Sequence, residues 1–411
     1  MATRDVGIES MSVYLPLYAL SLGELAVARG VDPQKYRLGL GLDTMAIAPP
    51  CEDAVTLAAN AAAPLFERGL VDREEIGLLL VATESAVDHA KPVSIFVHEL
   101  LRAQPACRTY ELKHACYGGT AALMTAAQWV ASGASRGRKA LVIASDIARY
   151  DARSAGEPTQ GAGAVAMVVS DVPRQMTVDF RRSGSFAEGV FDFWRPLDRH
   201  EALVDGHYSV DCYLRALEGA YQDFECAGRG PDRPNPLPIT DRFGVFLYHV
   251  PFPRMAWKAH RRLLELDWRL REEEAALDED FAQASFENAV SPYLGACRAI
   301  GNSYTASLYF CLATLLERHG ERLRDEPVAL FSYGSGCCAE FFNGVVGPAA
   351  GSGEIGIESL LAARQPITVD GYEAMRAATV DLSCGPPEGF QGRFYYAGTN
   401  RDRRRYLPAA G

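Results

Sequence analysis

Several features that would assign the chain to a large class of proteins are missing from its 411 residues. No run of about 18 apolar residues is present, so a membrane-spanning helix is not expected. The N-terminal MATRDVGIESMSVYLP lacks the charged and then apolar order of a secretory signal. The ten cysteines form no C-x-x-C pair and no Cys/His spacing of a metal site. We therefore predict a cytoplasmic protein without a metal, whose cysteines are mostly buried free thiols.

The sequence also lacks an excess of positive charge. It has 41 Lys and Arg against 52 Asp and Glu, a formal net charge of −11. Nucleic acids and anionic membranes select basic surfaces, so neither is an expected partner. With 48% hydrophobic and 23% charged residues, the composition is that of a globular protein. The length suits two or three domains, or two fused halves.

Apolar runs alternate with segments of helical pattern along the chain. Continuous hydrophobic runs suit strands of a sheet that is covered on both faces, which predicts an α/β fold. Strands are predicted at Ile76–Ser85, Lys139–Asp146, Gly163–Asp171, Phe243–Pro251 and Pro327–Gly336, and helices at Gly118–Ala134 and Ser303–Gly320.

Three other segments are predicted to lie at the surface. Leu264–Asp280 is highly charged and predicts a solvated helical surface. Cys226–Asp241 is dense in Gly and Pro and predicts a loop that joins the two halves. The final RDRRRYLPAAG predicts a basic tail with solvated arginines.

Two parts of the chain share one order of features, which suggests an internal duplication. One apolar strand ends at Glu84 and another at His249. Cys116 and Asn302 each begin a predicted helix, and a further apolar strand follows each at similar spacing. Two packed copies of one α/β unit would bring these four polar side chains together; a chance similarity is the alternative.

Cys116 is the candidate nucleophile among the ten cysteines. It stands at a predicted helix start and is followed by Tyr117, Gly118 and Gly119. The positive end of a helix dipole lowers a thiol pKa, which favours the reactive thiolate. Glycines let a substrate approach the backbone, whose N–H groups stabilise an oxyanion. The alternative is a buried, inert cysteine.

Glu84 and His249 are candidates for proton transfer. A carboxyl group at the end of an apolar strand is partly desolvated, which raises its pKa toward that of a general base or acid. Imidazole can polarise a carbonyl or move a proton near pH 7. The alternatives are a solvent-facing Glu84 and a hydrogen-bonded core histidine at position 249.

Two further motifs suggest binding. Four basic residues after His249 have helical spacing that gathers most of them on one face, where they could hold a phosphate group or an acidic partner; a solvated face is the alternative. The glycine-rich FSYGSGCC (331–338) matches neither GxGxxG nor GxxxxGK[ST], so a nucleotide is not expected. Its N–H groups at Gly334 to Gly336 could complete an oxyanion hole, or form a plain turn. The basic residues are Arg254, Lys258, Arg261 and Arg262.

Taken together, the motifs of residues 7–344 resemble those of the hydroxymethylglutaryl-CoA (HMG-CoA) synthases of the thiolase superfamily. ACYGGTAAL alone would also fit ketosynthases, whereas the set is specific. It comprises GLGLDTMAIAPPCEDAVTLAANAA (39–62), VATES (81–85), ACYGGTAAL (115–123), ALVIASDIARY (140–150), PTQGAGAVAM (158–167), FDFWRP (191–196), VDGHYSVDCYL (204–214), YHVPFPRMAWK (248–258), GNSYTASLY (301–309) and FSYGSG (331–336).

The resemblance implies a fold and an assembly. The expected fold is the duplicated, five-layered αβαβα thiolase fold, assembled as a homodimer. Residues 1–225 would form the half that carries Glu84 and Cys116, and residues 226–411 the half that carries His249 and Asn302. No tightly bound cofactor is implied, because the substrates arrive on a phosphopantetheine arm.

The resemblance also implies roles for individual residues. Cys116 is the implied nucleophile, Glu84 the general base and acid, and His249 the residue that binds the acceptor. Further residues match positions of the substrate pocket, and the basic residues after His249 would receive the phosphopantetheine or its carrier. The pocket residues are Asn302, Tyr333, Ser335, Ser209 and Gly334, and the carrier residues Arg254, Lys258, Arg261 and Arg262.

The motifs leave the carrier of the substrates open. Cys337-Cys338 followed by AEFF resembles the synthases of polyketide β-branching, which take substrates from donor and acceptor acyl carrier proteins. VDGHYSVDCYL and FDFWRP resemble equally the mevalonate-pathway synthases, which use coenzyme A. We predict the first: an acetyl group from a donor acyl carrier protein is held on Cys116, condenses with the β-ketone of an acceptor on a second acyl carrier protein, and is then hydrolysed from the enzyme. The mevalonate-pathway synthase that uses acetyl-CoA and acetoacetyl-CoA is the alternative. A decarboxylating ketosynthase, which needs no base such as Glu84, and a non-catalytic scaffold for acyl carriers are the rival hypotheses.

Overall fold

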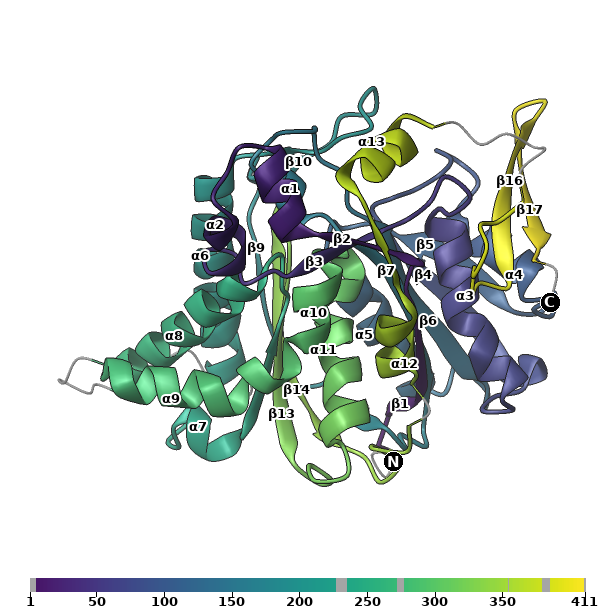
Figure 1. Ribbon diagram of the computed structural model, residues 1–411. Coiled ribbons are helices and arrows are strands. Elements are labelled where there is room, and N and C mark those ends of the chain that lie inside the picture. Colours follow the sequence, from purple (N-terminus) through teal and green to yellow (C-terminus); the bar gives the residue numbers. More distant parts are fainter. Residues whose placement is uncertain (1–4, 227–234, 272–276, 354, 379–384, 410–411) are drawn as a thin grey trace.

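The computed structural model describes residues 5–226, 235–271, 277–353, 355–378 and 385–409 of the chain. These residues form a mixed α/β structure around one large sheet (Figure 1). None of the helices in these ranges is both long and apolar enough to cross a membrane.

The large sheet has the strand order β12-β13-β14-β8-β1-β7-β6-β4-β5, and β9 also pairs with β14. The short β8 (Met176–Val178) joins the two groups of strands, because it pairs with both β1 and β14. One group comprises β1 (Gly7–Tyr14), β4 (Ile76–Ala82), β5 (Arg108–Leu112), β6 (Lys139–Ile147) and β7 (Ala162–Ser170), and the other β9 (Gly184–Ala187), β12 (Val245–Tyr248), β13 (Pro327–Gly334) and β14 (Cys338–Val346).

Both groups contain the same unit of three strands. β4 is parallel to β6, which is antiparallel to β7. In the same way, β12 is parallel to β13, which is antiparallel to β14. A helix precedes the middle strand each time: α5 (Gly118–Ala131) precedes β6, and α11 (Ser307–Thr314) precedes β13. The topology thus agrees with an internal duplication, while a boundary between residues 225 and 226 stays a prediction.

The helices lie in three layers around the two parts of the sheet (Figure 1). α5 and α11 are between these parts, where Thr120 and Tyr309 share a hydrogen bond of 2.8 Å. α3 (Ala54–Glu67) covers the outer face of the N-terminal strands, and α6 (Gly206–Cys226) and α8 (Pro253–Leu270) cover the C-terminal strands. The central helices pack so closely that a Cβ on Gly119 would lie 2.6 Å from the Thr305 carbonyl oxygen. This contact explains why the start of α5 consists of small residues.

Most of the predicted elements are confirmed. The strands predicted at Ile76–Ser85, Lys139–Asp146 and Gly163–Asp171 are β4, β6 and β7, and the helix predicted at Gly118–Ala134 is α5. In the second half, β13 is confirmed, while β12 is only four residues long. The helix predicted at Ser303–Gly320 is less regular: α11 is preceded by a 3₁₀ turn and followed by a π-helical turn.

Two of the surface predictions are wrong in part, and residues 272–276 of the first segment lie outside the described residues. Within the segment predicted as solvated, Leu264 and Asp267 are buried on the inner face of α8, and Asp267 accepts a hydrogen bond from Arg271. The C-terminal residues are not a tail, since β17 (Arg403–Pro408) pairs with β16 (Phe394–Asn400). Arg401, Arg403 and Arg405 are exposed as predicted, whereas Arg404 is half-buried and forms an ion pair of 2.6 Å with Asp53 at the start of α3. Half of the loop predicted at 226–241, residues 227–234, lies outside the described residues, and its last residues begin α7 (Ile239–Arg242).

Candidate active site

Cys116 lies in a tight turn two residues before α5 begins. The preceding Ala115 has a φ of 39°, in the left-handed region that few residues other than glycine adopt. Gly334 of β13 packs against this turn, and a Cβ at Gly334 would lie only 2.5 Å from the Tyr117 nitrogen. Gly334 therefore lies behind Cys116 and permits the close contact of the two halves, and it is not part of the cavity wall described below.

Cys116 and Glu84 are in direct contact. The Sγ atom of Cys116 donates to Oε1 of Glu84 over 3.4 Å. Glu84 is buried two residues after β4, and Arg195 donates a hydrogen bond to its backbone carbonyl. Burial, and then the nearby charge of Asp146, raises the pKa of Glu84 to about 8. This value suits a group that both takes up and returns a proton near neutral pH.

The predicted lowering of the Cys116 thiol pKa is wrong. Burial, followed by the neighbouring carboxyl groups with Glu84 first, raises this pKa well above its ordinary value. The effect of a helix dipole is confined to the first turn, and Cys116 precedes the helix. Cys116 is therefore a thiol at neutral pH, and its reaction needs a proton acceptor such as the adjacent Oε1 of Glu84.

Asp146 at the end of β6 fixes the backbone around Glu84, and sequence reasoning missed this role. Its Oδ1 accepts the Glu84 and Ser85 N–H groups over 2.9 and 3.0 Å. Its Oδ2 accepts the N–H and hydroxyl of Thr305 from the other half, over 3.1 and 2.5 Å. The signal was present, because Asp146 ends a buried apolar strand in the same way as Glu84.

His249 directly follows β12, much as Glu84 comes two residues after β4. Its Nδ1 and the Ser307 hydroxyl are 2.7 Å apart, and Tyr213 stacks on the ring. Burial lowers the pKa of His249 to about 3, so the imidazole is neutral. Ser307 Oγ already accepts the Val250 N–H, which leaves its own proton for Nδ1. This arrangement favours a His249 that carries its proton on Nε2 and can donate it to a substrate oxygen.

One cavity of about 270 Å³ collects side chains from both halves. Asn302 is oriented there because its Oδ1 accepts the Tyr304 N–H over 2.9 Å, which leaves the amide donor for a ligand. Glu84 is not on the wall and lies behind Cys116. The predicted residues on the cavity wall are Cys116, His249, Asn302, Ser209, Tyr333 and Ser335, and the aromatic ones include Tyr150, Phe193 and Tyr304.

Asp192, in the FDFWRP motif, binds three residues around this cavity. Sequence reasoning missed this role too. It accepts hydrogen bonds from the Tyr333 hydroxyl over 2.6 Å and from Ser209 Oγ over 3.3 Å. It also accepts the Gly336 N–H over 2.9 Å. The Gly336 N–H is therefore occupied, which contradicts its predicted place in an oxyanion hole.

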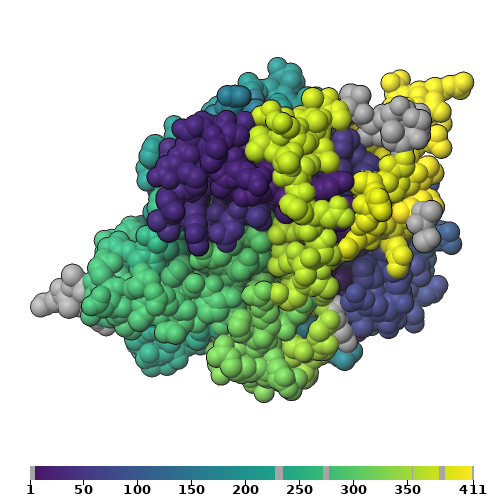
Figure 2. Space-filling model, viewed as in Figure 1, coloured from purple at the N-terminus to yellow at the C-terminus, as the bar shows by residue number. Residues whose placement is uncertain are grey.

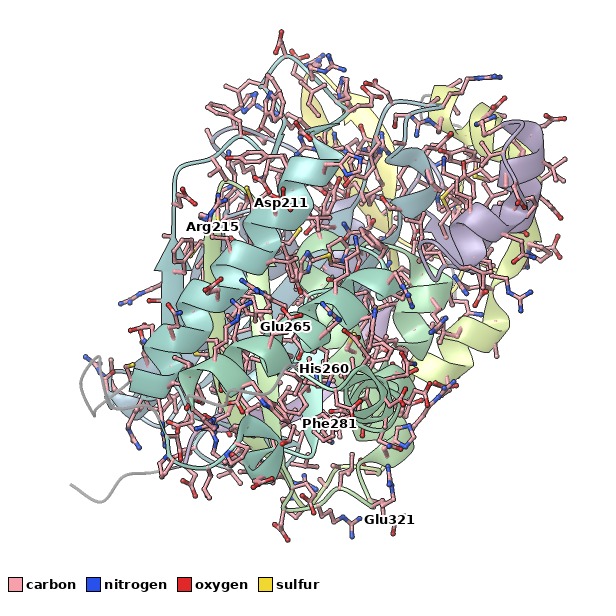
Figure 3. All side chains as sticks on the ribbon, turned by 90° about the vertical axis from the view of Figure 1, so that its left-hand side faces the viewer. Asp211, Arg215, His260, Glu265, Phe281 and Glu321 are labelled. Carbon is pink, nitrogen blue, oxygen red and sulfur yellow. The ribbon has the colours of Figure 1, made fainter. Side chains whose placement is uncertain are left out.

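The predicted carrier residues lie on α8 beside α6, on the face that Figure 3 shows with Asp211, Arg215 and Glu265 labelled. Arg261 is paired with Glu265 and Glu279, and Arg262 with Glu218 and Glu265. Arg254 lies over the ring of Trp257 on its own helix. Among the described residues, this face therefore carries charges of both signs rather than a basic patch.

Other chemically active groups are sparse in the part of the chain that the structure describes. No three His, Cys, Asp or Glu side chains there are placed to hold a metal ion. Eight cysteines in these ranges are free thiols, at positions 51, 107, 116, 212, 297, 311, 337 and 338.

Family models match nearly the whole chain. Residues 2–173 match the N-terminal model of hydroxymethylglutaryl-coenzyme A synthase, and residues 176–285 and 274–375 match the C-terminal model. Hydroxymethylglutaryl-CoA synthase of Enterococcus faecalis is 36% identical over 379 residues, which is 92% of each chain.

Two solved structures are also similar over the full length. MvaS in complex with 3-hydroxy-3-methylglutaryl coenzyme A has 42% identity and a TM-score of 0.93, and covers 99% of this chain and 100% of its own. The HMG synthase of the curacin biosynthetic pathway, in complex with an apo donor acyl carrier protein, has 32% identity, a TM-score of 0.88 and the same coverage. The expected thiolase fold is thereby confirmed. The chain is an enzyme of the hydroxymethylglutaryl-CoA synthase family.

Proposed function

We propose that this enzyme joins an acetyl thioester to the β-ketone of a second thioester, with Cys116, Glu84 and His249 as its catalytic residues. The observation that carries the proposal is the contact of Cys116 Sγ with Glu84 Oε1 beside a cavity that His249 and Asn302 also line. A decarboxylating ketosynthase needs no such carboxyl group, because loss of carbon dioxide forms its enolate.

The first step transfers the acetyl group to the enzyme. Glu84, in its ionised form, takes the thiol proton of Cys116, and the sulfur attacks the thioester carbonyl. The new bond is between sulfur and the acetyl carbon, and the bond to the carrier sulfur breaks. Glu84 returns the proton to that leaving thiolate, which frees the carrier and leaves Glu84 ionised.

The second step forms the carbon–carbon bond. Ionised Glu84 removes a proton from the methyl group of acetyl-Cys116, and the resulting enolate attacks the β-carbon of the acceptor. Neutral His249 and the amide of Asn302 donate hydrogen bonds to the ketone oxygen, where negative charge develops. Glu84 then gives its proton to the alkoxide, and water hydrolyses the thioester at Cys116. The product carries a β-hydroxyl group and a new carboxymethyl branch.

The carrier of the two acyl groups is the finer part of the proposal. The sequence predicts acyl carrier proteins of a polyketide pathway, because of Cys337 and Cys338, and the curacin synthase is a relative crystallised with such a carrier. One observation favours coenzyme A: the identity to the MvaS structure is 42% against 32% for the curacin synthase. We therefore rank coenzyme A first and the carrier protein second.

A comparison of donors tests both levels of the proposal. The enzyme is given acetyl-CoA or acetyl-loaded carrier protein, and the acetyl group on the enzyme is quantified by mass spectrometry. Faster acetylation by acetyl-CoA supports the first candidate, and the reverse supports the second. Absence of acetylation with both donors would contradict the condensing function and support a non-catalytic scaffold.

The assembly and compartment follow from the same proposal. We expect a homodimer, and β5 offers one contact because it is an edge strand of the described sheet with half-exposed side chains. Light scattering with size-exclusion chromatography measures this mass directly, and a monomer at micromolar concentration would contradict the prediction. The free thiols suit the reducing cytoplasm, where we place the reaction.

A further inference from the structure

A helix of the C-terminal segment reaches the back of the active-site cavity. α13 (Val369–Ala377) follows β15 (Gln365–Ile367), which pairs with the N-terminal strand β2 (Tyr18–Ser21). Figure 2 shows this yellow-green segment packed against the purple N-terminal segment on one face of the molecule. Two of its side chains, Tyr372 and Arg376, enter a hydrogen-bond network with residues that border the cavity.

Arg376 holds the backbone of Tyr150 directly at the carbonyl and, through Gln160, at the N–H. Its Nη2 donates to the Tyr150 carbonyl over 2.9 Å, and its Nη1 donates to Gln160 Oε1 over 3.0 Å. The same Gln160 oxygen accepts the Tyr150 N–H over 2.8 Å. Gln160 is buried and in turn donates to the Tyr372 hydroxyl over 2.8 Å. Loss of such a partner leaves a buried carbonyl or amide without a hydrogen bond. The resulting loss of stability is larger than the net stability that the bond contributes.

The network ends at two groups that face the substrate. The Tyr150 ring lines the cavity and packs edge-to-face on Phe193 and Tyr304, which line it too. Gln160 is bridged to Asn302 on the neighbouring segment, and the Asn302 N–H donates to the Thr159 carbonyl over 2.8 Å. Arg376 is not on the cavity wall. It acts on the wall through its hydrogen bonds to Tyr150 and Gln160.

We infer that Arg376, with Tyr372, is a positioning residue that sets Tyr150 and Asn302 for the acceptor substrate. The inference rests on the proposed function, because it assigns the network to one of its two steps. Glu84 is held separately, by Asp146, and the turn of Cys116 packs on Gly334 of β13. A loosened Tyr150–Asn302 wall therefore impairs the condensation much more than the acetylation of Cys116.

The test compares the two steps in Arg376→Met with those in the unaltered enzyme, using the donor that the unaltered enzyme accepts and the matching acetoacetyl thioester. We expect kcat/KM for the acceptor to fall about tenfold to a hundredfold, since small displacements of reacting groups cost that much. The rate of acetylation should change less than about threefold. Arg376→Lys keeps the charge without the paired donors and should recover little.

Three further variants make the outcome decisive. Glu201→Gln removes the weak ion pair of Arg376 (3.8 Å) and should leave both steps unchanged. Arg318→Met removes a surface guanidinium paired with Glu358 and is the matched control. Tyr372→Phe removes one hydroxyl and should weaken condensation several-fold even if Arg376→Met does not fold. Equal loss of both steps, or loss of neither, would overturn the inference, whereas an inactive unaltered enzyme would overturn the proposed function instead.

Discussion

The two repeated units of this enzyme share a backbone plan and differ in the chemistry they carry. A strand ends before Glu84 in one unit and before His249 in the other. In both, the residue before the next polar group has a left-handed backbone: Ala115 before Cys116, with a φ of 39°, and Gly301 before Asn302, with a φ of 84°. The same plan thus presents the proposed nucleophile and base on one side, and the two proposed neutral hydrogen-bond donors on the other.

Burial acts on both units and gives opposite pKa shifts. It raises the pKa of Glu84 to about 8 and lowers that of His249 to about 3, because it disfavours the charged form of each. At neutral pH both groups are therefore mainly uncharged. Of the two, only Glu84 is close enough to ionisation to exchange a proton during turnover. Glu84 is therefore the proposed proton-transfer group, and His249 the proposed group that polarises the acceptor ketone.

The largest expected effect comes from the first unit. Glu84→Ala should reduce condensation by about 10³-fold or more, because Glu84 is the carboxyl group in contact with the sulfur that would carry the acetyl group. Acetyl-Cys116 should still form, but more slowly because Glu84 also takes the thiol proton; the loss should be smaller than for condensation, since removal of this carboxyl group also removes one cause of the high thiol pKa. Single-turnover assays of each step measure this split. Condensation at a normal rate would remove Glu84 from the mechanism.

A smaller effect is expected from the equivalent position of the second unit. His249→Ala should reduce kcat/KM for the acceptor about 10²-fold, the cost of losing one donor to a developing oxyanion. Acetylation of Cys116 should keep its rate. His249→Gln retains a hydrogen-bond donor and should recover part of the lost rate. Equal losses of acetylation and condensation in His249→Ala would contradict the assignment of the acceptor to the second unit.

The pH dependence sharpens the comparison further. Enolate formation requires ionised Glu84, so loss of deuterium from a deuterated acetyl group on Cys116 should rise about tenfold per pH unit and level off near pH 8. Below that pH a growing fraction of Glu84 is protonated. His249 adds no second inflection between pH 5 and 9, because its lowered pKa keeps it neutral throughout. An inflection near 4.5 would show that Glu84 behaves as an ordinary carboxyl group.

The smallest effects concern the two left-handed residues. Gly301→Ala should lower the free energy of unfolding by about 2 kcal/mol or more, because the conformation is strained and the Cβ would lie 2.0 Å from the Gln160 carbonyl oxygen. Ala115→Gly should change it by less than about 1 kcal/mol, since relief of strain is offset by the flexibility of glycine. Urea unfolding measures the free energy of unfolding of both variants. Equal losses of stability would contradict the expected difference between Gly301→Ala and Ala115→Gly.

The strands, the central helices and the four polar side chains that begin or end them could be predicted from the sequence for physical reasons. Continuous apolar runs specify buried strands, and Glu84 and His249 stand where such runs end. Asp192 was missed because its role depends on a long-range hydrogen bond from Tyr333 that no local pattern reveals, whereas Asp146 stands at the end of an apolar strand and could have been noticed there. The predicted direction of the Cys116 pKa shift was wrong because only the helix start is visible in the local sequence. The carboxyl groups of Glu84, Asp146 and Asp192, which raise this pKa, come together only in the fold.

The central claim is that the sulfur of Cys116 carries the acetyl group in contact with Glu84. The most direct measurement is peptide mapping by mass spectrometry after brief incubation with the acetyl donor, on the unaltered enzyme and on Cys116→Ser. We expect one acetyl group per chain on the peptide that contains Cys116, and no comparable label in the variant. An acetyl group on another residue, or equal labelling of the two proteins, would contradict the account.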